Sequence, residues 1–230
     1  MRGFRLIHIP SIARYKRERW LYSWALGSIS FGGASLLIPL YIVQLGASPV
    51  QLGILAATAA GIGAPGAILF GRLANHIRHR RPLVLVTLAT VAIALATIPL
   101  LSSIDAVIVV NAALWLVVAS VAPVLTMLVV DEAPESAWSE RIGLLNKYQG
   151  YGWASGLVLG AIWPFVGRLL VGPTAVTRVL FWVLALCAAA SVLSATRSLP
   201  RPAPESHVTS ERWIRKVARL LSSSNRGIKV

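Results

Sequence analysis

The side chains that could do covalent chemistry are poorly placed for an enzyme. Ser155, flanked by Ala154 and Gly156 in an apolar run, is the candidate nucleophile, and a serine nucleophile needs a base within hydrogen-bond reach. All the histidines lie outside the apolar runs, so that base is missing. We therefore expect no catalytic residue and no enzymatic activity. The histidines are His8, His76, His79 and His207.

Metal and redox chemistry is equally poorly supported. The apolar runs lack the clustered carboxylates, imidazoles and thiolates that metals prefer as ligands. Cys187 is the only cysteine, which excludes an intrachain disulfide and leaves the redox compartment undetermined. We expect no metal site and no cofactor.

The strongest concentration of charge is a short basic stretch between two long apolar runs. Residues 71–83 carry Arg72, Arg78, Arg80 and Arg81, and the flanking runs, 50–70 and 83–101, contain no charge. Each run is long enough to cross about 30 Å of hydrocarbon as a helix. Because short loops rich in Arg and Lys stay on the cytoplasmic side, this stretch predicts the orientation of the chain.

The composition also belongs in a bilayer. The 230 residues are 56% hydrophobic and only 13% charged, with a mean hydropathy of +0.71. The net charge of +14 comes from loops and tails rather than from one folded surface, so it favours orientation and lipid contact over nucleic-acid binding. We expect the lipid bilayer as a partner and no nucleic acid.

Six apolar runs, free of charge except for Arg178 near the start of the sixth, predict an all-α, polytopic membrane protein with six transmembrane helices. Six spans put both termini on one side, which we expect to be the cytoplasmic side of the cell membrane (plasma or inner). This leaves only Arg168 and Arg178 of the 22 Lys and Arg residues outside. The predicted spans are Leu21–Val43, Val50–Phe70, Leu83–Leu101, Ala106–Val130, Tyr148–Val166 and Val176–Ala195.

The predicted organisation has three parts: a basic cytoplasmic segment at 1–20, a membrane domain at 21–196 and a basic cytoplasmic tail at 197–230. Within the tail, Glu211 to Leu221 reads as a short amphipathic helix on the membrane surface, with a disordered basic tail as the alternative.

Small residues and a weak repeat suggest how the spans are arranged. Glycines crowd the second and fifth spans, where small residues let helices approach closely in lipid and could also allow rocking. Ala34-Ser35 precedes Pro39 in the first span, and Ala119-Ser120 precedes Pro123 in the fourth. Three spans repeated twice would form a 3+3 inverted repeat.

Taken together, these features resemble the amino-terminal half of a major facilitator superfamily transporter. The family signature between the second and third helices is matched by Gly71, Leu73, Ala74, Arg80 and Leu83, whereas Asn75 replaces its aspartate, His76 its arginine, Arg78 its glycine and His79 its first basic residue. Further matches are Gly46 to Gly53, Pro123 to Asp131, Pro134, Glu140 to Gly143, and the glycines of the fifth span. The resemblance covers about residues 15–200.

The resemblance implies a conformational latch at the cytoplasmic end. In the family, the loop charges pair with an acid at the end of the fourth helix, a place that Asp131 takes here. Because Asn75 cannot carry charge, we expect a latch that is weakened or rebuilt; a basic loop that only orients the protein is the alternative. The latch candidates are Gly71, Asn75, Arg78, Arg80, Arg81, Asp131 and Arg141.

The resemblance also places the first and fourth spans at a substrate cavity, with additions from the fifth. Asn111 is the best single candidate, because an amide within a span needs a partner or a polar cavity; a structural hydrogen bond to a neighbouring helix is the other interpretation. The cavity candidates are Trp24, Ser28, Phe31, Asn111, Trp115, Gln149, Tyr151 and Ser155.

The implied function is transport of a small solute by alternating access. Members of the family have two six-span halves, so we expect a half-transporter that pairs with a second six-span half, as a homodimer or a heterodimer. The alternatives are a non-transporting assembly or regulatory protein and a truncated remnant. No Asp, Glu, Lys, Arg or His lies in the inner part of any span, which favours facilitated diffusion, an apolar or neutral substrate, or coupling supplied by the partner.

Overall fold

The computed structural model describes residues 19–76, 81–132, 134–171 and 175–199, and within them every regular element is a helix. The six long helices are α1 (Arg19–Gln44), α2 (Pro49–His76), α3 (Arg81–Thr97), α4 (Ile104–Glu132), α5 (Trp138–Val171) and α6 (Val176–Ser198). Two short 3-10 turns, η2 (Ile98–Leu100) and η3 (Glu135–Ala137), follow α3 and precede α5. The all-α prediction is confirmed for these residues.

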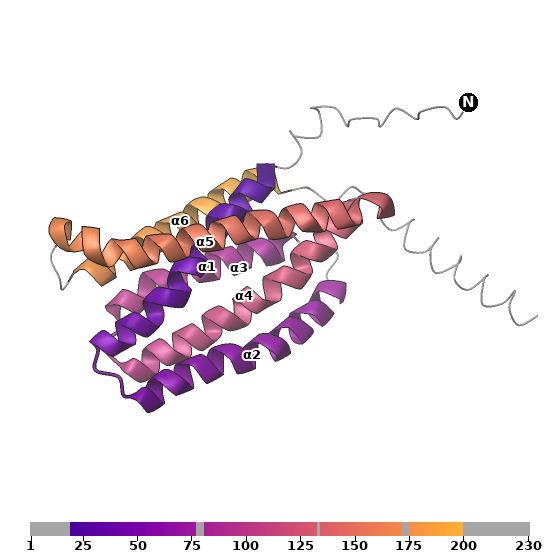
Figure 1. Cartoon of the computed structure of the whole chain (residues 1–230). Coiled ribbons are helices and arrows are strands. Elements are labelled where there is room, and N and C mark those ends of the chain that lie inside the picture. Colours follow the sequence, from indigo (N-terminus) through magenta and orange to yellow (C-terminus); the bar gives the residue numbers. More distant parts are fainter. Residues whose placement is uncertain (1–18, 77–80, 133, 172–174, 200–230) are drawn as a thin grey trace, which may run out of the picture. The chain divides into compact units, whose positions relative to one another are not determined.

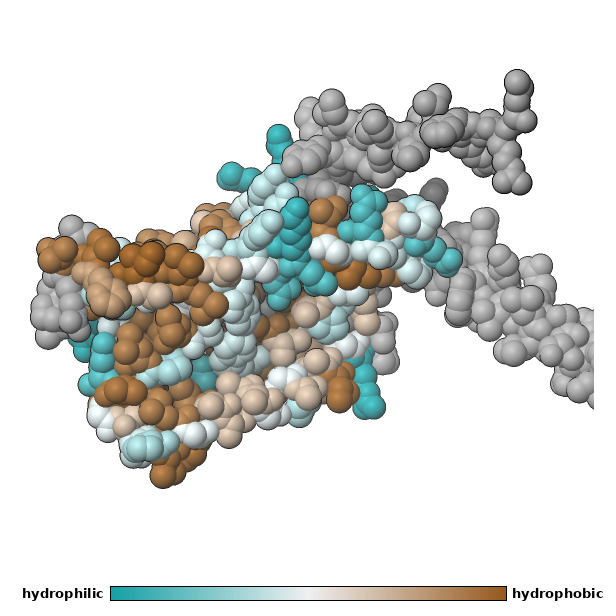
Figure 2. All heavy atoms as spheres, viewed as in Figure 1, coloured by the Kyte–Doolittle hydropathy of each residue, from teal (hydrophilic) through white to brown (hydrophobic). Residues whose placement is uncertain are grey.

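The helices alternate in direction, so that α1, α3 and α5 begin at the end of the bundle where α2, α4 and α6 finish (Figure 1). We call this the basic end, because Arg81 of α3, Arg141 of α5 and Arg197 of α6 lie there. Figure 2 shows hydrophilic surface gathered towards this end, around the start of α5 and the finish of α2. The middle of the bundle is apolar because the long uncharged runs of the sequence form it, and charged residues between those runs lie at the basic end.

Among the described residues, five helices are long and apolar enough to cross a membrane: α1, α2, α3 with η2, α4 and α6. The fifth predicted span lies within α5, which has 34 residues but a more polar composition and is not one of these five helices. Tyr148, Gln149, Tyr151 and several glycines lower its hydropathy. By length and composition the chain is therefore a multi-pass membrane protein, with α5 as its least apolar helix.

The packing partners of each helix are specific. The most extensive contacts join α1 to α5 and α2 to α4; next come α1 with α6, α3 with α6 and α3 with α4. In the membrane-length windows, 61% of the α1 residues are buried against the other helices but only 11% of those in α2. α1 is therefore the central helix, and α2 leans on α4 with most of its surface uncovered.

Glycine brings α1 and α5 into backbone contact. A Cβ built on Gly32 would collide with the carbonyl group of Trp153, and one on Gly152 or Gly156 would collide with the carbonyl oxygen of Ala25 or Ile29. Only glycine permits this approach, as predicted for the fifth span. In the second span, the built Cβ of Gly66 meets Leu116 of α4, whereas Gly53 and Gly61 face open space.

A glycine turn and two side-chain hydrogen bonds connect the helices at the end opposite the basic end. Gly46 has a φ of +87°, which suits glycine and turns the chain between α1 and α2. The Tyr41 hydroxyl donates to the carbonyl oxygen of Leu101 at 2.8 Å, and Trp163 Nε1 donates to that of Val176 at 2.8 Å. These bonds close the end of the bundle opposite the basic end.

The described helices belong to one compact unit that ends at Leu199. The predicted amino-terminal segment, except for its last two residues, and the predicted tail helix at 211–221 lie outside the described residues. Those two predictions therefore remain predictions.

Candidate functional site

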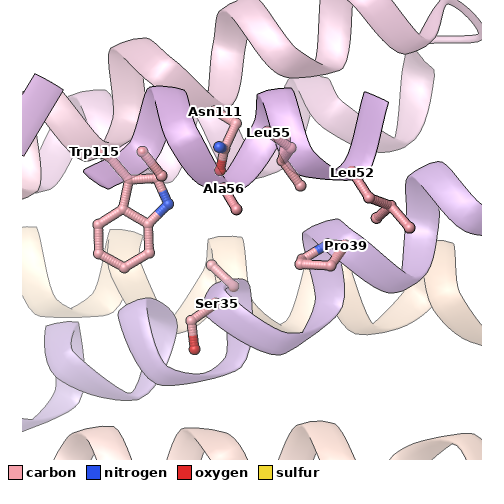
Figure 3. Close-up of a pocket in the computed structure, with 9 residues that line it drawn as sticks. Ser35, Pro39, Leu52, Leu55, Ala56, Asn111 and Trp115 are labelled. Carbon is pink, nitrogen blue, oxygen red and sulfur yellow. The ribbon is translucent and has the colours of Figure 1, made fainter. Parts of the chain in front are cut away.

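A cavity of about 370 Å³ lies between α1, α2 and α4. It sits nearer the end opposite the basic end, since it involves the last turns of α1 and the first turns of α2 and α4. Figure 3 shows side chains from these helices directed into the same space. The lining residues are Ala34, Ser35 and Pro39 of α1, Leu52, Leu55, Ala56 and Ala59 of α2, and Asn111 and Trp115 of α4.

The cavity exists because α1 and α2 barely touch there. Both helices are held by other partners, α1 by α5 and α6 and α2 by α4, so the space between them is not closed by direct packing. Small side chains on the facing surfaces, Ala34 on α1 with Ala56 and Ala59 on α2, leave the space unfilled. The cavity is therefore formed by small side chains on the helices themselves.

Proline shapes the α1 wall of the cavity. Pro39 lies inside α1 and has no N–H, so the carbonyl of Ser35 cannot receive the usual helical hydrogen bond from position 39. The Ser35 hydroxyl donates instead to the carbonyl oxygen of Gly32 at 2.7 Å. The Ser35 hydroxyl proton is therefore already used, and Figure 3 shows its oxygen turned away from Asn111.

Asn111 is the polar centre of the cavity. Its side chain is only 2% exposed, yet it makes no hydrogen bond to any residue in the described part of the chain. Figure 3 shows its amide directed into the space bounded by Ser35 and Pro39. The structural hydrogen bond to a neighbouring helix, the other interpretation of Asn111 given above, is not formed among the described residues.

Trp115 forms the cavity wall one turn further along α4. Its ring lies 6.0 Å from that of Trp153 on α5, at an angle of 45°. The two indoles bridge α4 and α5, which otherwise have few contacts. Trp115 thus presents an aromatic surface to the cavity and is itself held by α5.

The other predicted cavity residues on α1 lie in the helical core and do not line this cavity. Trp24, Ser28 and Phe31 are all buried. The rings of Trp24 and Phe31 make an edge contact at 5.6 Å, and the Ser28 hydroxyl donates to the Trp24 carbonyl oxygen at 2.9 Å. Trp24 Nε1 is buried without a hydrogen-bond partner in the described residues.

The predicted residues of α5 are also separate from the cavity. Tyr151 is 63% exposed and lies beneath the Lys147 ammonium group, which is 5.8 Å from its ring centroid. Ser155 is exposed and Gln149 is half-buried. These side chains form part of an uncovered surface of α5.

The structure describes only some of the residues of the predicted latch. Arg78 and Arg80 lie outside the described residues, as do the side chains of Asn75 and Asp131, whose backbones are in the last turns of α2 and α4. Gly71 faces open space. The pairing predicted for this end therefore stays a prediction.

Arg81 makes a different contact at the same end. Its Nη2 donates to the carbonyl oxygen of Thr196 in the last turn of α6, where a cation is favoured by the helix dipole. Its Nε is buried without a hydrogen-bond partner in the described part. Arg81 thus links the start of α3 to the finish of α6. Arg141, in the first turns of α5, is half-buried.

A hydroxyl network between α1 and α6 was not predicted from the sequence. Ser23 Oγ lies 2.7 Å from Ser194 Oγ and 3.0 Å from Ser198 Oγ, and the Ser191 hydroxyl donates to the Ser23 carbonyl oxygen at 2.6 Å. Serines at intervals of three and four residues in the sixth span were the available signal, because they share one helical face. The network has a structural effect: it joins α1 to α6 near the basic end.

Comparison with known proteins gives one match and one negative result. No curated protein sequence matches the chain. Residues 23–223 match the family model described as the Major Facilitator Superfamily.

Proposed function

Since the chain belongs to the major facilitator superfamily, it is a membrane transport protein, and we propose that it moves a small solute by alternating access as one half of a transporter. The observation that carries this proposal is the cavity among membrane-length helices, with the unpaired Asn111 amide directed into it. A buried amide without a partner is unfavourable in an apolar setting, and a bound solute would supply that partner.

We further propose that the six helices form a 3+3 inverted repeat. Exchanging the first three helices for the last three converts the α1–α5 contact into α4–α2 and the α1–α6 contact into α4–α3, and both pairs are present. The repeated serines support the same exchange. The Ser35 and Ser120 hydroxyls each donate to the carbonyl oxygen three residues earlier, and a proline follows each serine.

The proposed second half would cover the open faces of α2 and α5. On α2, Gly53 and Gly61 face open space, and on α5, Tyr151 and Ser155 are exposed. Lipid favours plain aliphatic surface, whereas small and polar residues are typical of helix–helix contacts in membranes. A second six-helix half, from a homodimer or a heterodimer, would bury this surface and complete the enclosure of the cavity.

A leucine on the open face of α2 tests the pairing. Gly61→Leu should leave the single half folded, because nothing lies within 4 Å of a Cβ built there, but it should separate the halves. Val86→Leu on α3, where Val86 is 61% exposed, is the matched control. Mass measurement in nanodiscs should show an assembly for the natural chain and the control and a loss of pairing for Gly61→Leu.

Transport itself is tested by solute uptake or efflux after deletion of the gene and after reconstitution. A monomer under mild extraction, with no uptake or efflux phenotype, would refute the half-transporter and leave the non-transporting assembly protein or the truncated remnant. A paired complex that supports uptake would establish the proposal. Because no lining residue of the cavity is charged, we expect facilitated diffusion or coupling by residues of the other half.

For orientation, we propose that the basic end faces the cytoplasm and that both termini lie there. The support is the position of Arg81, Arg141 and Arg197 at one end of the bundle. A cysteine placed at Arg80 in a Cys187→Ser background should resist an impermeant maleimide in intact cells. Labelling of that cysteine without lysis would overturn the orientation.

The latch is proposed to pair Asp131 with the basic stretch between α2 and α3. This proposal is supported by the packing of α2 against α4, two helices that finish at the same end of the bundle. Asp131→Ala should shift the complex towards the inward-facing state, and Asn75→Asp should strengthen the outward-facing state. Unchanged accessibility of cavity cysteines in both variants would indicate a loop that only orients the protein.

A further inference from the structure

The chemistry of the cavity wall limits what the cavity can hold. Nine residues line it, and none carries a charge. A charged group moved into such a site would lose its hydration without gaining a counter-ion, which is strongly unfavourable. The wall therefore selects against ions of either sign.

Two side chains in the wall have donors that no described residue uses: the amide of Asn111 and the indole N–H of Trp115. A primary amide offers two donor hydrogens and an acceptor oxygen with two lone pairs, and those of Asn111 find no partner among the described residues. The Ser35 hydroxyl proton is engaged with Gly32. A ligand that both accepts from and donates to Asn111 would satisfy the amide on both sides.

The remaining wall is aliphatic and aromatic. Leu52, Leu55, Pro39 and the ring of Trp115 enclose the space around the amide. At about 370 Å³ the cavity is near the lower limit of ligand pockets, which span roughly 300–1,000 Å³. Its occupant is accordingly compact, with an apolar body.

We propose that the cavity binds a compact, uncharged, largely apolar or aromatic molecule that carries one amide-like group, and that Asn111 recognises this group. The inference rests on the proposed function in that the ligand is taken to be the transported solute. Its binding chemistry follows from the wall alone and is measured without transport.

A set of probes with nearly the same shape tests the charge preference. Benzamide, benzoate and benzamidinium differ mainly in charge, and toluene lacks the amide. Saturation-transfer NMR with the full chain in nanodiscs should show benzamide binding at least tenfold tighter than either ion. Equal affinity for benzamide and benzoate would overturn the proposal.

Asn111→Leu tests the recognition. Leucine is close to asparagine in shape but cannot form hydrogen bonds, so benzamide affinity should fall roughly tenfold while toluene affinity is unchanged or higher. A correctly folded Asn111→Leu variant that binds benzamide like the natural chain would refute the assignment. Should this variant fail to fold, Ala59→Phe, which fills the cavity from α2 and retains Asn111, should abolish benzamide binding.

Cysteine protection locates the bound probe. In a Cys187→Ser background, benzamide should slow N-ethylmaleimide labelling of Ala59→Cys, which lines the cavity, but not of Ala60→Cys, which is exposed on the same helix outside it. Equal effects at both positions would contradict binding in the cavity.

The two proposals fail in different ways. Asn111-dependent benzamide binding in a chain that supports no uptake would leave the cavity assignment intact and refute transport. Uptake of solutes without Asn111-dependent benzamide binding would support transport and refute the cavity assignment.

Discussion

Replacing Gly156 with alanine tests whether α1 and α5 are held by backbone contact. A Cβ at this position collides with the carbonyl oxygen of Ile29 and lies 2.7 Å from the amide nitrogen of Gly33. Both obstacles are backbone atoms of α1, so no change of rotamer relieves the overlap and the helices must move apart. Overpacking of this kind destabilises proteins by about 1–3 kcal/mol.

The same helix supplies two graded controls. Gly150 has nothing within 4 Å of its built Cβ, so alanine there should be neutral or stabilise by up to about 1 kcal/mol through helix propensity. Gly160 is intermediate, because its built Cβ lies 3.3 Å from the Leu36 Cδ2, a side-chain atom that can yield. The difference in free energy of unfolding between Gly156→Ala and Gly150→Ala should then be about 1–4 kcal/mol.

Thermal unfolding in detergent measures the series. A chain of this size shifts its melting temperature by about 2–4 °C per kcal/mol, so Gly156→Ala should melt on the order of 2–16 °C below Gly150→Ala, with Gly160→Ala between them. A Gly156→Ala variant as stable as Gly150→Ala would refute the argument, because it would mean that α1 and α5 do not touch through their backbones.

Two further changes examine the bonds at either end of the bundle. Ser191→Ala removes the donor to the Ser23 carbonyl and should lower the stability of the α1–α6 contact by about 0.6–2 kcal/mol, seen as a lower melting temperature; an unchanged melt would mean that the bond contributes nothing net. Trp163→Phe keeps an aromatic ring but removes the hydrogen bond from Nε1 to the Val176 carbonyl oxygen, so it should raise the rate of trypsin cleavage between α5 and α6. A variant that resists trypsin as well as the natural chain would argue against a contribution from that bond.

The sequence predicts the helices well because charges interrupt the apolar runs, but it misjudges the length of α5. The predicted span begins at Tyr148, whereas the helix begins at Trp138. Charge marks where hydrocarbon ends, and a helix can continue past that point into water. Glu140 in the first turn is favourable there, because it lies near the positive end of the helix dipole.

From the sequence, only the α4 wall of the cavity could be predicted, through Asn111 and Trp115. Asn111 stands out because an amide in an apolar run needs an explanation. Leu52 and Ala56 give no such signal, since an aliphatic residue looks the same in sequence whether it faces lipid, a neighbouring helix or a cavity. The contribution of α2 to the wall therefore needed the structure.

The serine network was missed for a related reason. Ser23 and Ser191 are 168 positions apart, and single hydroxyls within a span often bond to their own helix, as Ser28 does. Which serines bond across helices depends on the packing of α1 against α6. No local pattern carries that information.

The order in which the helices are synthesised gives the α1–α5 contact a further consequence. α1 is complete at Gln44, but its main partner does not begin until Trp138. At elongation rates of roughly 5–20 residues per second, α1 spends on the order of 5–20 seconds in or beside the membrane before α5 starts to emerge. During that interval the hydroxyl of Ser30 and the close-contact surface at Gly32 have no native partner. The contact that holds α1 most firmly in the finished bundle is therefore one of the last that it can form.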